Sequence, residues 1–292
     1  MKIEKMLKKY RVQHGKHFRL KDFDPADTHG LDETKDEAKK LLADGVEKLS
    51  ELQDILAAQD RWGLLVIFQA LDAAGKDGTI KHVMSGVNPQ GVDVTSFKVP
   101  TEEERNHGYL WRTAQHAPAR GRIGIFNRSY YEEVLVVRVH ADVLAAEKLP
   151  PKLVTKNIWE ERFEDINNFE RYMTHNGIAV VKFFLHLSKK EQKRRFLERL
   201  DTPAKNWKFS AADIKERRFW DDYQVAYEEA IRATAREYAP WYVVPADHKW
   251  FTRLVVAQVL VGELKALKLE YPKVTGEMKK ELAAARRALE KE

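Results

Sequence analysis

The chain has 292 residues, of which 43% are hydrophobic and 33% charged, so it is long enough to bury the core of one large domain. It contains no cysteine, which excludes disulfide bonds, thiolate catalysis and cysteine-bound metals. The net charge of +6 favours an anionic partner, such as a nucleotide, a phosphate polymer or nucleic acid, without choosing among them.

The first residues of the chain are basic and are not followed by the apolar core of a secretory signal. No apolar run approaches the roughly 18 residues that a membrane span needs. We therefore expect a cytoplasmic protein that does not enter a membrane. Residues 11–34 contain the breakers Gly15, Pro25 and Gly30, which predict an irregular arm, and the apolar spacing over residues 36–59 predicts a helix.

Five short apolar runs predict the strands of a sheet. The first, residues 64–68, is continuous, as expected of a strand buried on both faces. Ser188 with Glu191, and Ser210 with Asp213, resemble capping boxes that open two helices, and helical patterns separate most of the runs. Such alternation indicates an α/β fold with a parallel sheet, in which ligands bind beyond the carboxyl ends of the strands. The other runs are residues 92–99, 123–126, 178–187 and 241–244, and the charged end of the chain predicts a final helix.

The stretch ALDAAGKDGTI, residues 70–80, is similar to the phosphate-binding loop G-x-x-x-x-G-K-[ST]. Gly75 and Lys76 match this pattern, whereas Ala70 and Asp77 replace the first glycine and the hydroxyl residue. A loop that joins a strand to a helix points backbone N–H groups at an anion, and Lys76 can neutralise a terminal phosphate. The predicted phosphate ligands here are Ala73, Ala74, Gly75, Asp77, Gly78, Thr79 and Lys81.

Three acidic residues and one arginine add to this predicted site. Asp72 would be repelled by bound phosphates unless a metal lay between them, which suggests Mg²⁺, although a turn-forming role is the alternative. Arg128 follows the strand of residues 123–126 and could grip phosphate as a fork donor. Glu132 and Glu133 could supply a metal ligand or a base, or could be solvated charges.

Residues 189–223 are rich in basic and aromatic side chains. They could form a salt-bridged pair of surface helices, or a mobile lid that closes over phosphates and excludes water. Phosphoryl transfer favours the second interpretation, because charge spreads over the equatorial oxygens and needs cations. The histidines show no ligand spacing, so no transition-metal site is expected. The predicted polyphosphate ligands of this region are Arg195, Arg199, Lys205 and Lys208.

From about Lys9 to Tyr271 the chain resembles the polyphosphate kinase 2 family. The resemblance rests on QALDAAGKDGTI, GVNPQGVDVTSFKVPTEEE, FNRSYYEEVLVVRV, RRFLERLDTPAKNWKFSAADIKERRFWDDY and YAPWYVVPADHKW. It implies a three-layer αβα P-loop kinase fold with a five-stranded parallel sheet and a helical lid. It also implies reversible, Mg²⁺-dependent phosphate transfer between inorganic polyphosphate and the purine nucleotides AMP, ADP, GMP or GDP. Nucleic acid and membranes are not implied as partners, whereas a homodimer or homotetramer is.

The resemblance also assigns roles to individual residues. It implies that Asp72 and Lys76 lie at the transferred phosphate, and that Arg128 holds the polyphosphate chain. Most of the family has an aspartate where this chain has Asn127, whose role stays open, and an asparagine where it has Glu132. The variant looks like the subgroup that accepts both nucleoside mono- and diphosphates. We expect Glu132 to restore a carboxylate near Mg²⁺ or the acceptor phosphate, with Glu133 a less favoured candidate, so the expected catalytic residues are Asp72, Lys76, Arg128 and Glu132, and the expected Mg²⁺ ligands are Asp72 and Glu132.

Two alternatives remain open at this level: an ATP-dependent nucleotide kinase and a non-catalytic module that binds polyanions. A long basic channel would favour a polymer as donor, and a compact adenine pocket would favour ATP. Base preference and reaction direction are also open. We expect a single domain in four parts: an arm and helix (1–60), a core (61–187 and 241–270), a lid region (188–240) and a C-terminal helix (274–292).

Overall fold

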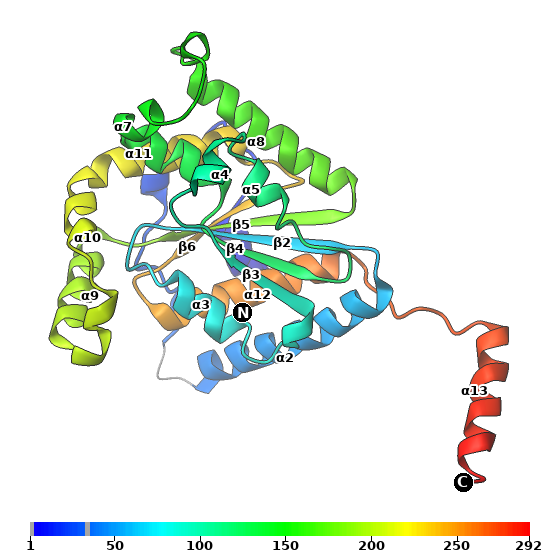
Figure 1. Ribbon diagram of the computed structural model, residues 1–292. Helices are drawn as coiled ribbons and strands as arrows, with labels where there is room; N and C mark the ends of the chain where they lie inside the picture. Colours follow the sequence, from blue (N-terminus) through cyan, green and yellow to red (C-terminus); the bar gives the residue numbers. More distant parts are fainter. Residues whose placement is uncertain (1–2, 33–35) are drawn as a thin grey trace.

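The centre of the molecule is a six-stranded sheet with the strand order β1-β6-β5-β2-β4-β3 (Figure 1). A computed structural model describes residues 3–32 and 36–292, without the side chains of residues 3, 4, 36–38 and 208. The five strands from β6 to β3 run parallel, which confirms the expected parallel sheet. They are β2 (Gly63–Gln69), β3 (Val92–Ser96), β4 (Ile123–Asn127), β5 (Ile178–His186) and β6 (Trp241–Pro245).

The sixth strand comes from the arm that the sequence predicts to be irregular. β1 (Arg11–Val12) pairs antiparallel with β6 and covers that edge of the sheet. It follows α1 (Ile3–Tyr10), and a short 3₁₀ turn, η1 (Leu20–Asp22), comes after it. A strand of two residues is too short to show a recognisable pattern in the sequence. It forms because the edge of β6 has backbone N–H and C=O groups with which it can pair.

The side chains of β2 explain the layered architecture. All seven residues are buried, and alternate ones enter two different hydrophobic clusters. Leu64, Val66 and Phe68 pack under one face, where α2 (Asp36–Gln59), α3 (Lys76–Val83) and α12 (Lys249–Ala266) lie (Figure 1). Most residues of α12 are buried, because this helix lies between the sheet and α2. A strand buried on both faces requires helices on both sides of the sheet.

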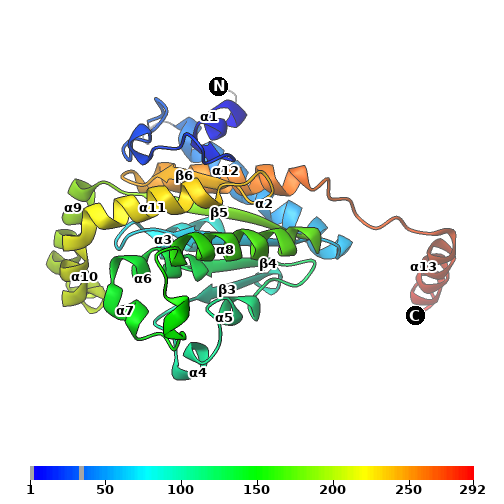
Figure 2. The ribbon, with the colours of Figure 1, turned by 90° about the horizontal axis from the view of Figure 1, so that it is seen from above.

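The opposite face is covered by α8 (Ile158–His175) and α11 (Trp220–Thr234), which lie side by side in Figure 2. The short helix α6 (Val136–Val139) and the 3₁₀ turn η3 (Tyr130–Val134) complete this layer. Leu65 and Ile67 of β2 point into this cluster. The molecule therefore has three layers, as the sequence predicts.

Region 188–240 divides into two parts. α9 (Lys189–Asp201), η5 (Pro203–Lys208), α10 (Ala211–Glu216) and η6 (Arg217–Phe219) stand at the end of the sheet where its strands finish (Figure 1). α11 instead packs into the core, with Tyr227 and Ile231 buried.

Both predicted caps of this region form, but in different ways. The Ser188 hydroxyl accepts the N–H of Glu191, but the Ser188 N–H donates to Asp247 instead of Glu191, so only half of the expected capping box forms. The Ser210 hydroxyl accepts the N–H of Ala212 rather than that of Asp213, so the second cap is a tighter turn.

The remaining elements are short or peripheral. They are η2 (Pro89–Gly91), α4 (Glu102–Arg105), α5 (Trp111–Ala114), α7 (Ala141–Ala145), η4 (Pro151–Leu153) and α13 (Gly276–Leu289). α13 projects away from the body of the molecule in both views (Figures 1 and 2), and residues 270–292 are all exposed. In the described part of the chain, no helix combines the length and apolarity needed to cross a bilayer.

Candidate active site

The loop between β2 and α3 has the backbone geometry of an anion-binding turn. Gly75 caps α3 with a φ of 102°, in the left-handed region that favours glycine. Ala73 has a φ of 63°, which costs a residue with a side chain about 1–2 kcal/mol. Such strain persists where surrounding contacts hold the backbone in place. The residues of this loop and of the start of α3 line a cleft at the carboxyl edge of the sheet.

Two side chains from α9 hold this loop. The Arg195 guanidinium donates through Nη1 to the carbonyls of Ala73 (3.0 Å) and Ala74 (2.9 Å). Its Nη2 donates to two carbonyls just after β6, at 2.6 and 3.0 Å. Gln192 donates to the carbonyl of Asp72 at 3.0 Å. Arg195 is 5% exposed and lines the cleft, but its Nε donates to Glu191 and its two Nη atoms donate to these carbonyls, so in this arrangement it anchors the loop.

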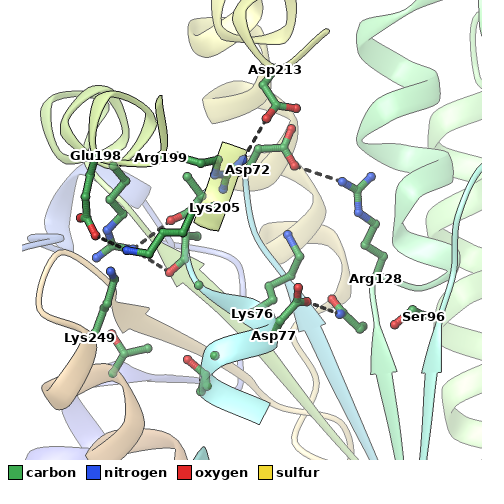
Figure 3. Close-up of a pocket in the computed structure, with 18 of the residues that line it drawn as sticks. Asp72, Lys76, Asp77, Ser96, Arg128, Glu198, Arg199, Lys205, Asp213 and Lys249 are labelled. Carbon is green, nitrogen blue, oxygen red and sulfur yellow. Dashed lines mark hydrogen bonds and ion pairs between the residues drawn. The ribbon is translucent and has the colours of Figure 1, made fainter. Parts of the chain in front are cut away.

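Lys76 begins α3, and its Nζ donates to the carbonyl of Ala70 at 2.8 Å. Figure 3 shows its side chain reaching toward the space between Asp72 and Arg128. Burial, followed by the nearby Arg128 guanidinium, lowers the pKa of Lys76, while neighbouring carboxylates act in the opposite sense. A phosphate in the cleft would therefore favour the charged form of this lysine.

Arg128 joins the two expected catalytic carboxylates. It follows β4 with a φ of 66°, and its N–H donates to the carbonyl of Phe68 at 3.0 Å. Its Nη2 donates to Asp72 Oδ1 at 3.1 Å and its Nη1 to Glu132 Oε2 at 3.2 Å. These two carboxylates, Glu132 first, raise the pKa of Arg128. The sequence predicted all three residues, and the fold brings them together from two neighbouring strands.

The side-chain amides of Gln69 and Asn127 donate hydrogen bonds to acidic side chains at this edge of the sheet and so orient them. Gln69, fully buried at the end of β2, donates to Glu132 Oε1 at 2.8 Å. Asn127 donates to Asp77 Oδ1 at 2.7 Å. Asn127, which departs from the family pattern, therefore holds Asp77, which departs from the phosphate-loop pattern. Sequence reasoning missed Gln69, although its position directly after a buried strand is a usable signal.

A cleft of about 820 Å³ opens in front of the loop (Figure 3). It is lined by every residue from Asp72 to Thr79 and by Arg128. Basic residues missed by the sequence analysis also line it, because they follow β3 and β6 at the same edge: Lys98, Lys249 and Arg253. Burial, followed by the neighbouring Arg195, lowers the pKa of Lys249. The cleft is therefore a basic chamber suited to a polyanion.

The remaining predicted cations, in α3 and in the lid region, reach the cleft unequally. Arg199 and Lys205 line it, where Arg199 Nη1 donates to Asp213 at 3.1 Å and Lys205 Nζ donates to Glu198 at 2.7 Å. Such ion pairs can exchange a carboxylate for a phosphate when an anion enters. Lys81 is exposed and is absent from the residues that line the cleft. The side chain of Lys208 lies outside the described residues.

A second cleft, of about 650 Å³, lies on the other side of Arg128. The two clefts share Arg128 and the segment Phe97–Val99. Glu132 lines the second cleft, as do apolar residues such as Val137 and Leu149. Arg128 and Glu132 therefore stand at the junction of a basic chamber and a more apolar one.

The acidic residues fit Mg²⁺ in the way that phosphate enzymes bind it. Within the described residues, no group of three His, Asp or Glu side chains forms a cage for a metal. Mg²⁺, however, is commonly held by one or two carboxylates together with substrate phosphates. The Asp72 carboxylate is 32% exposed at the cleft, whereas both oxygens of Glu132 accept hydrogen bonds from protein. Asp72 is therefore the better-placed ligand of the two.

Comparisons with known proteins show the family of the chain. The polyphosphate kinase 2 family model matches residues 32–272. The ADP-polyphosphate phosphotransferase of Rhodopseudomonas palustris is 50% identical over 290 residues, which cover 99% of each chain. The AMP/ADP-polyphosphate phosphotransferase of Meiothermus ruber is 48% identical over 266 residues, covering 91% of this chain and 96% of the relative. The crystal structure of polyphosphate kinase 2 from Arthrobacter aurescens superimposes with a TM-score of 0.87 at 41% identity, covering 98% of this chain and 97% of that one.

Proposed function

The chain belongs to the polyphosphate kinase 2 family, and from that premise we propose that it transfers the terminal phosphoryl group of inorganic polyphosphate to AMP and ADP. It is a polyphosphate phosphotransferase. GMP and GDP are further acceptors in this proposal. The observation that carries it is the position of Arg128, between a basic chamber beside the phosphate loop and a second cleft.

The proposed reaction is a direct in-line displacement. The polyphosphate chain lies in the basic chamber and the nucleotide in the second cleft. An oxygen of the acceptor phosphate forms a bond to the terminal phosphorus, while the bond from that phosphorus to the bridging oxygen breaks. The leaving group is polyphosphate shortened by one unit, and no covalent enzyme intermediate is needed. The reverse reaction follows the same path.

The protein contributes position and charge to this step. Lys76 and the N–H groups of the loop neutralise the transferred phosphate. Arg128 contacts the phosphates at the junction, and Asp72 and Glu132 fix the direction of its guanidinium. Holding both reactants in line removes much of the entropic barrier.

Kinases of this family generally use a divalent metal ion. We propose Mg²⁺, held by Asp72, with Glu132 as the second carboxylate. When bound, the ion neutralises charge on the donor and acceptor phosphates. We further propose that the enzyme works in the cytoplasm.

The elements α9 to η6 act as the lid in this proposal, because they carry Arg199 and Lys205 over the chamber. α11 belongs to the core instead, since its inner face is buried. We also propose that the protein forms a homo-oligomer, to which the exposed helix α13 contributes.

The proposed function is tested with purified protein, Mg²⁺, polyphosphate and either AMP or ADP, followed by separation of the products. ATP made from AMP supports a dual acceptor, whereas ATP made only from ADP contradicts it. Replacing polyphosphate by ATP as the donor tests the alternative of an ordinary nucleotide kinase. Binding of polyphosphate without turnover would leave only the polyanion-binding alternative.

Two variants test the assigned residues. Asp72→Asn and Lys76→Ala should each lower kcat by about 100-fold or more, the usual loss when a charge-stabilising group is removed. Lys48→Ala is the matched control, because Lys48 is an exposed lysine of α2 paired with Glu51. Turnover close to the wild type in either site variant would remove that residue from the mechanism.

A further inference from the structure

An ion pair without solvent contact lies behind the active-site edge of the sheet. Lys182 of β5 and Glu170 of α8 are both 0% exposed, and Lys182 Nζ donates to Glu170 Oε2 at 2.5 Å. Taking two charges out of water is costly, and an apolar pair of similar volume is often no less stable. The presence of this pair in the core therefore calls for a reason other than stability.

Every polar group of the pair has a defined partner. Lys182 Nζ also donates to the carbonyl of Thr234 at 2.9 Å and to the Tyr131 hydroxyl at 3.1 Å, so all three ammonium donors are used. Glu170 Oε1 accepts the hydroxyls of Tyr130 (3.0 Å) and Tyr131 (2.8 Å). Because each bond fixes the next, this buried network orders the two tyrosines.

The two tyrosines belong to the segment that carries the active-site residues. η3 begins at Tyr130, two residues after Arg128, and it contains Glu132. Along this segment the tyrosines point into the core, whereas Glu132 lines the second cleft. The same short turn therefore has one face in the buried network and another at the site.

Arg128 needs such an anchor because its own backbone is strained. Its φ of 66° lies in the left-handed region, which is unfavourable for a residue with a side chain. Upstream, its N–H is held by the carbonyl of Phe68 at 3.0 Å. Downstream, the Ser129 hydroxyl accepts the N–H of Tyr131 at 3.1 Å, and the hydroxyl of Tyr131 reaches Glu170. Strained backbone persists only where contacts on both sides determine it.

We propose that Glu170 and Lys182 are positioning residues for phosphoryl transfer. They hold the hydroxyls of Tyr130 and Tyr131 and so keep the side chains of Arg128 and Glu132 in position at the junction of the two clefts. Neither residue touches a substrate. The inference rests on the proposed function, since it assumes that Arg128 and Glu132 act on the phosphates.

Tyr131→Phe tests the proposal with the smallest possible change, the loss of one hydroxyl. We expect kcat to fall about tenfold or more, because small misplacements of reacting groups are costly, while both KM values stay within about twofold. Tyr10→Phe is the matched control: Tyr10 is 1% exposed, and its hydroxyl donates to Asp27 at 2.7 Å on the other face of the sheet. Both variants lose a bond between a hydroxyl and a carboxylate, but Tyr131→Phe also removes the acceptor of the buried Lys182 Nζ, so its melting temperature should fall further than that of Tyr10→Phe.

A double-mutant cycle with Glu132→Gln separates positioning from general stability. If Tyr131 acts through the Arg128–Glu132 pair, Tyr131→Phe should change kcat much less in the Glu132→Gln background than in the wild type. Fully additive effects on kcat would overturn the proposal, as would equal kcat values for Tyr131→Phe and Tyr10→Phe. In those cases the proposed function still stands. If Glu132→Gln alone leaves kcat unchanged, the assigned role of Glu132 is wrong, and the positioning proposal falls with it.

Discussion

Arg195 shows how the same residue type can serve an anion site in two ways. Its place in a basic stretch predicts a phosphate ligand, but the structure buries it between α9, the phosphate loop and the end of β6. Four carbonyl oxygens on two segments accept its N–H groups. A planar guanidinium can satisfy such a set, whereas an ammonium cannot reach it with one nitrogen.

Arg195→Lys should therefore destabilise the protein in the absence of any substrate. We expect a loss of about 1.5–3 kcal/mol, the size of a buried hydrogen bond from a charged group. Arg194→Lys is the control, because Arg194 is 59% exposed and pairs with Glu191 and Glu198 of its own helix. Urea unfolding of both variants gives the comparison. Equal stability of Arg195→Lys and the wild type would contradict the anchoring role of Arg195.

Glu133 has a different environment from its neighbour Glu132. It pairs with Arg162 at 3.1 Å on the wall of the second cleft. Burial, followed by the Glu147 carboxylate, raises the pKa of Glu133 from 4.5 to about 8, although Arg162 acts in the opposite sense. The folded state thus holds a proton that the unfolded chain releases at lower pH.

The stability that comes from this proton is fully present below pH 4.5 and is lost as the pH rises through about 8. Glu133→Gln replaces the protonated acid with a neutral side chain of similar shape and removes this dependence. We expect the stability of the variant relative to the wild type to increase as the pH is raised across that window. Denaturant midpoints measured at several pH values test it, and parallel profiles for the two proteins would contradict it.

At the scale of elements, α13 stands apart from the rest of the chain. All its residues are exposed, and an isolated helix of this length is marginal in water. Its larger apolar residues, Met278, Leu282 and Leu289, recur at spacings of four and seven, and Ala285 lies on the same face, as in a helix that pairs with another. The family match ends at residue 272, before this helix begins. These features suit a contact between copies of the chain.

Charge on α13 favours a parallel pair with a second copy. In that arrangement Glu281 of one copy lies opposite Arg286 of the other. Both residues flank the apolar stripe formed by Met278, Leu282, Ala285 and Leu289. Glu281→Arg or Arg286→Glu alone should weaken association, and the two together should restore it, with kcat unchanged throughout. Light scattering over a range of concentrations measures the mass. A mass that is the same in all four proteins would exclude this pairing.

At the scale of the whole molecule, the positive charge gathers where the parallel strands end. Lys98, Lys249 and Arg253 follow strands that lie on opposite sides of β2, and the lid adds Arg199 and Lys205. A polymer can contact many of these cations at once, whereas in the second cleft the Lys and Arg residues are matched by an equal number of Asp and Glu residues. Electrostatic attraction should therefore matter more for the donor than for the acceptor.

The KM for long-chain polyphosphate should rise steeply with salt, because added ions screen interactions beyond about 8–10 Å. The KM for AMP should rise less, and kcat should change little. Tripolyphosphate is the matched control donor, since it spans fewer cations. Kinetics at several ionic strengths test this, and the same slope for the long and short donors would argue against a polymer lying along the chamber.

Much of the fold could be predicted from local patterns. The buried strands are continuous apolar runs, and the phosphate loop is recognisable because glycine, lysine and strand–helix context occur together within a dozen residues. β1 could not be predicted, because two residues are too few to show the alternation of apolar and polar side chains that marks a strand. After the cap at Ser210, α10, η6 and α11 follow one another without a gap, so the apolar pattern alone does not reveal that this helical stretch is divided.

The amino-acid sequence by itself determined the layered parallel sheet and the phosphate loop, because each depends on neighbours close in the chain. Asp72, Lys76, Arg128 and Glu132 were candidates from the sequence, since each stands in a segment that follows a predicted strand. Only the tertiary structure decided that Arg195 anchors the loop, that residues after β3 and β6 complete the basic chamber, and that Lys182 and Glu170 meet beneath η3. Those relations join segments many residues apart, and the packing of the strands, not any local pattern, sets which side chains come within a hydrogen bond of one another.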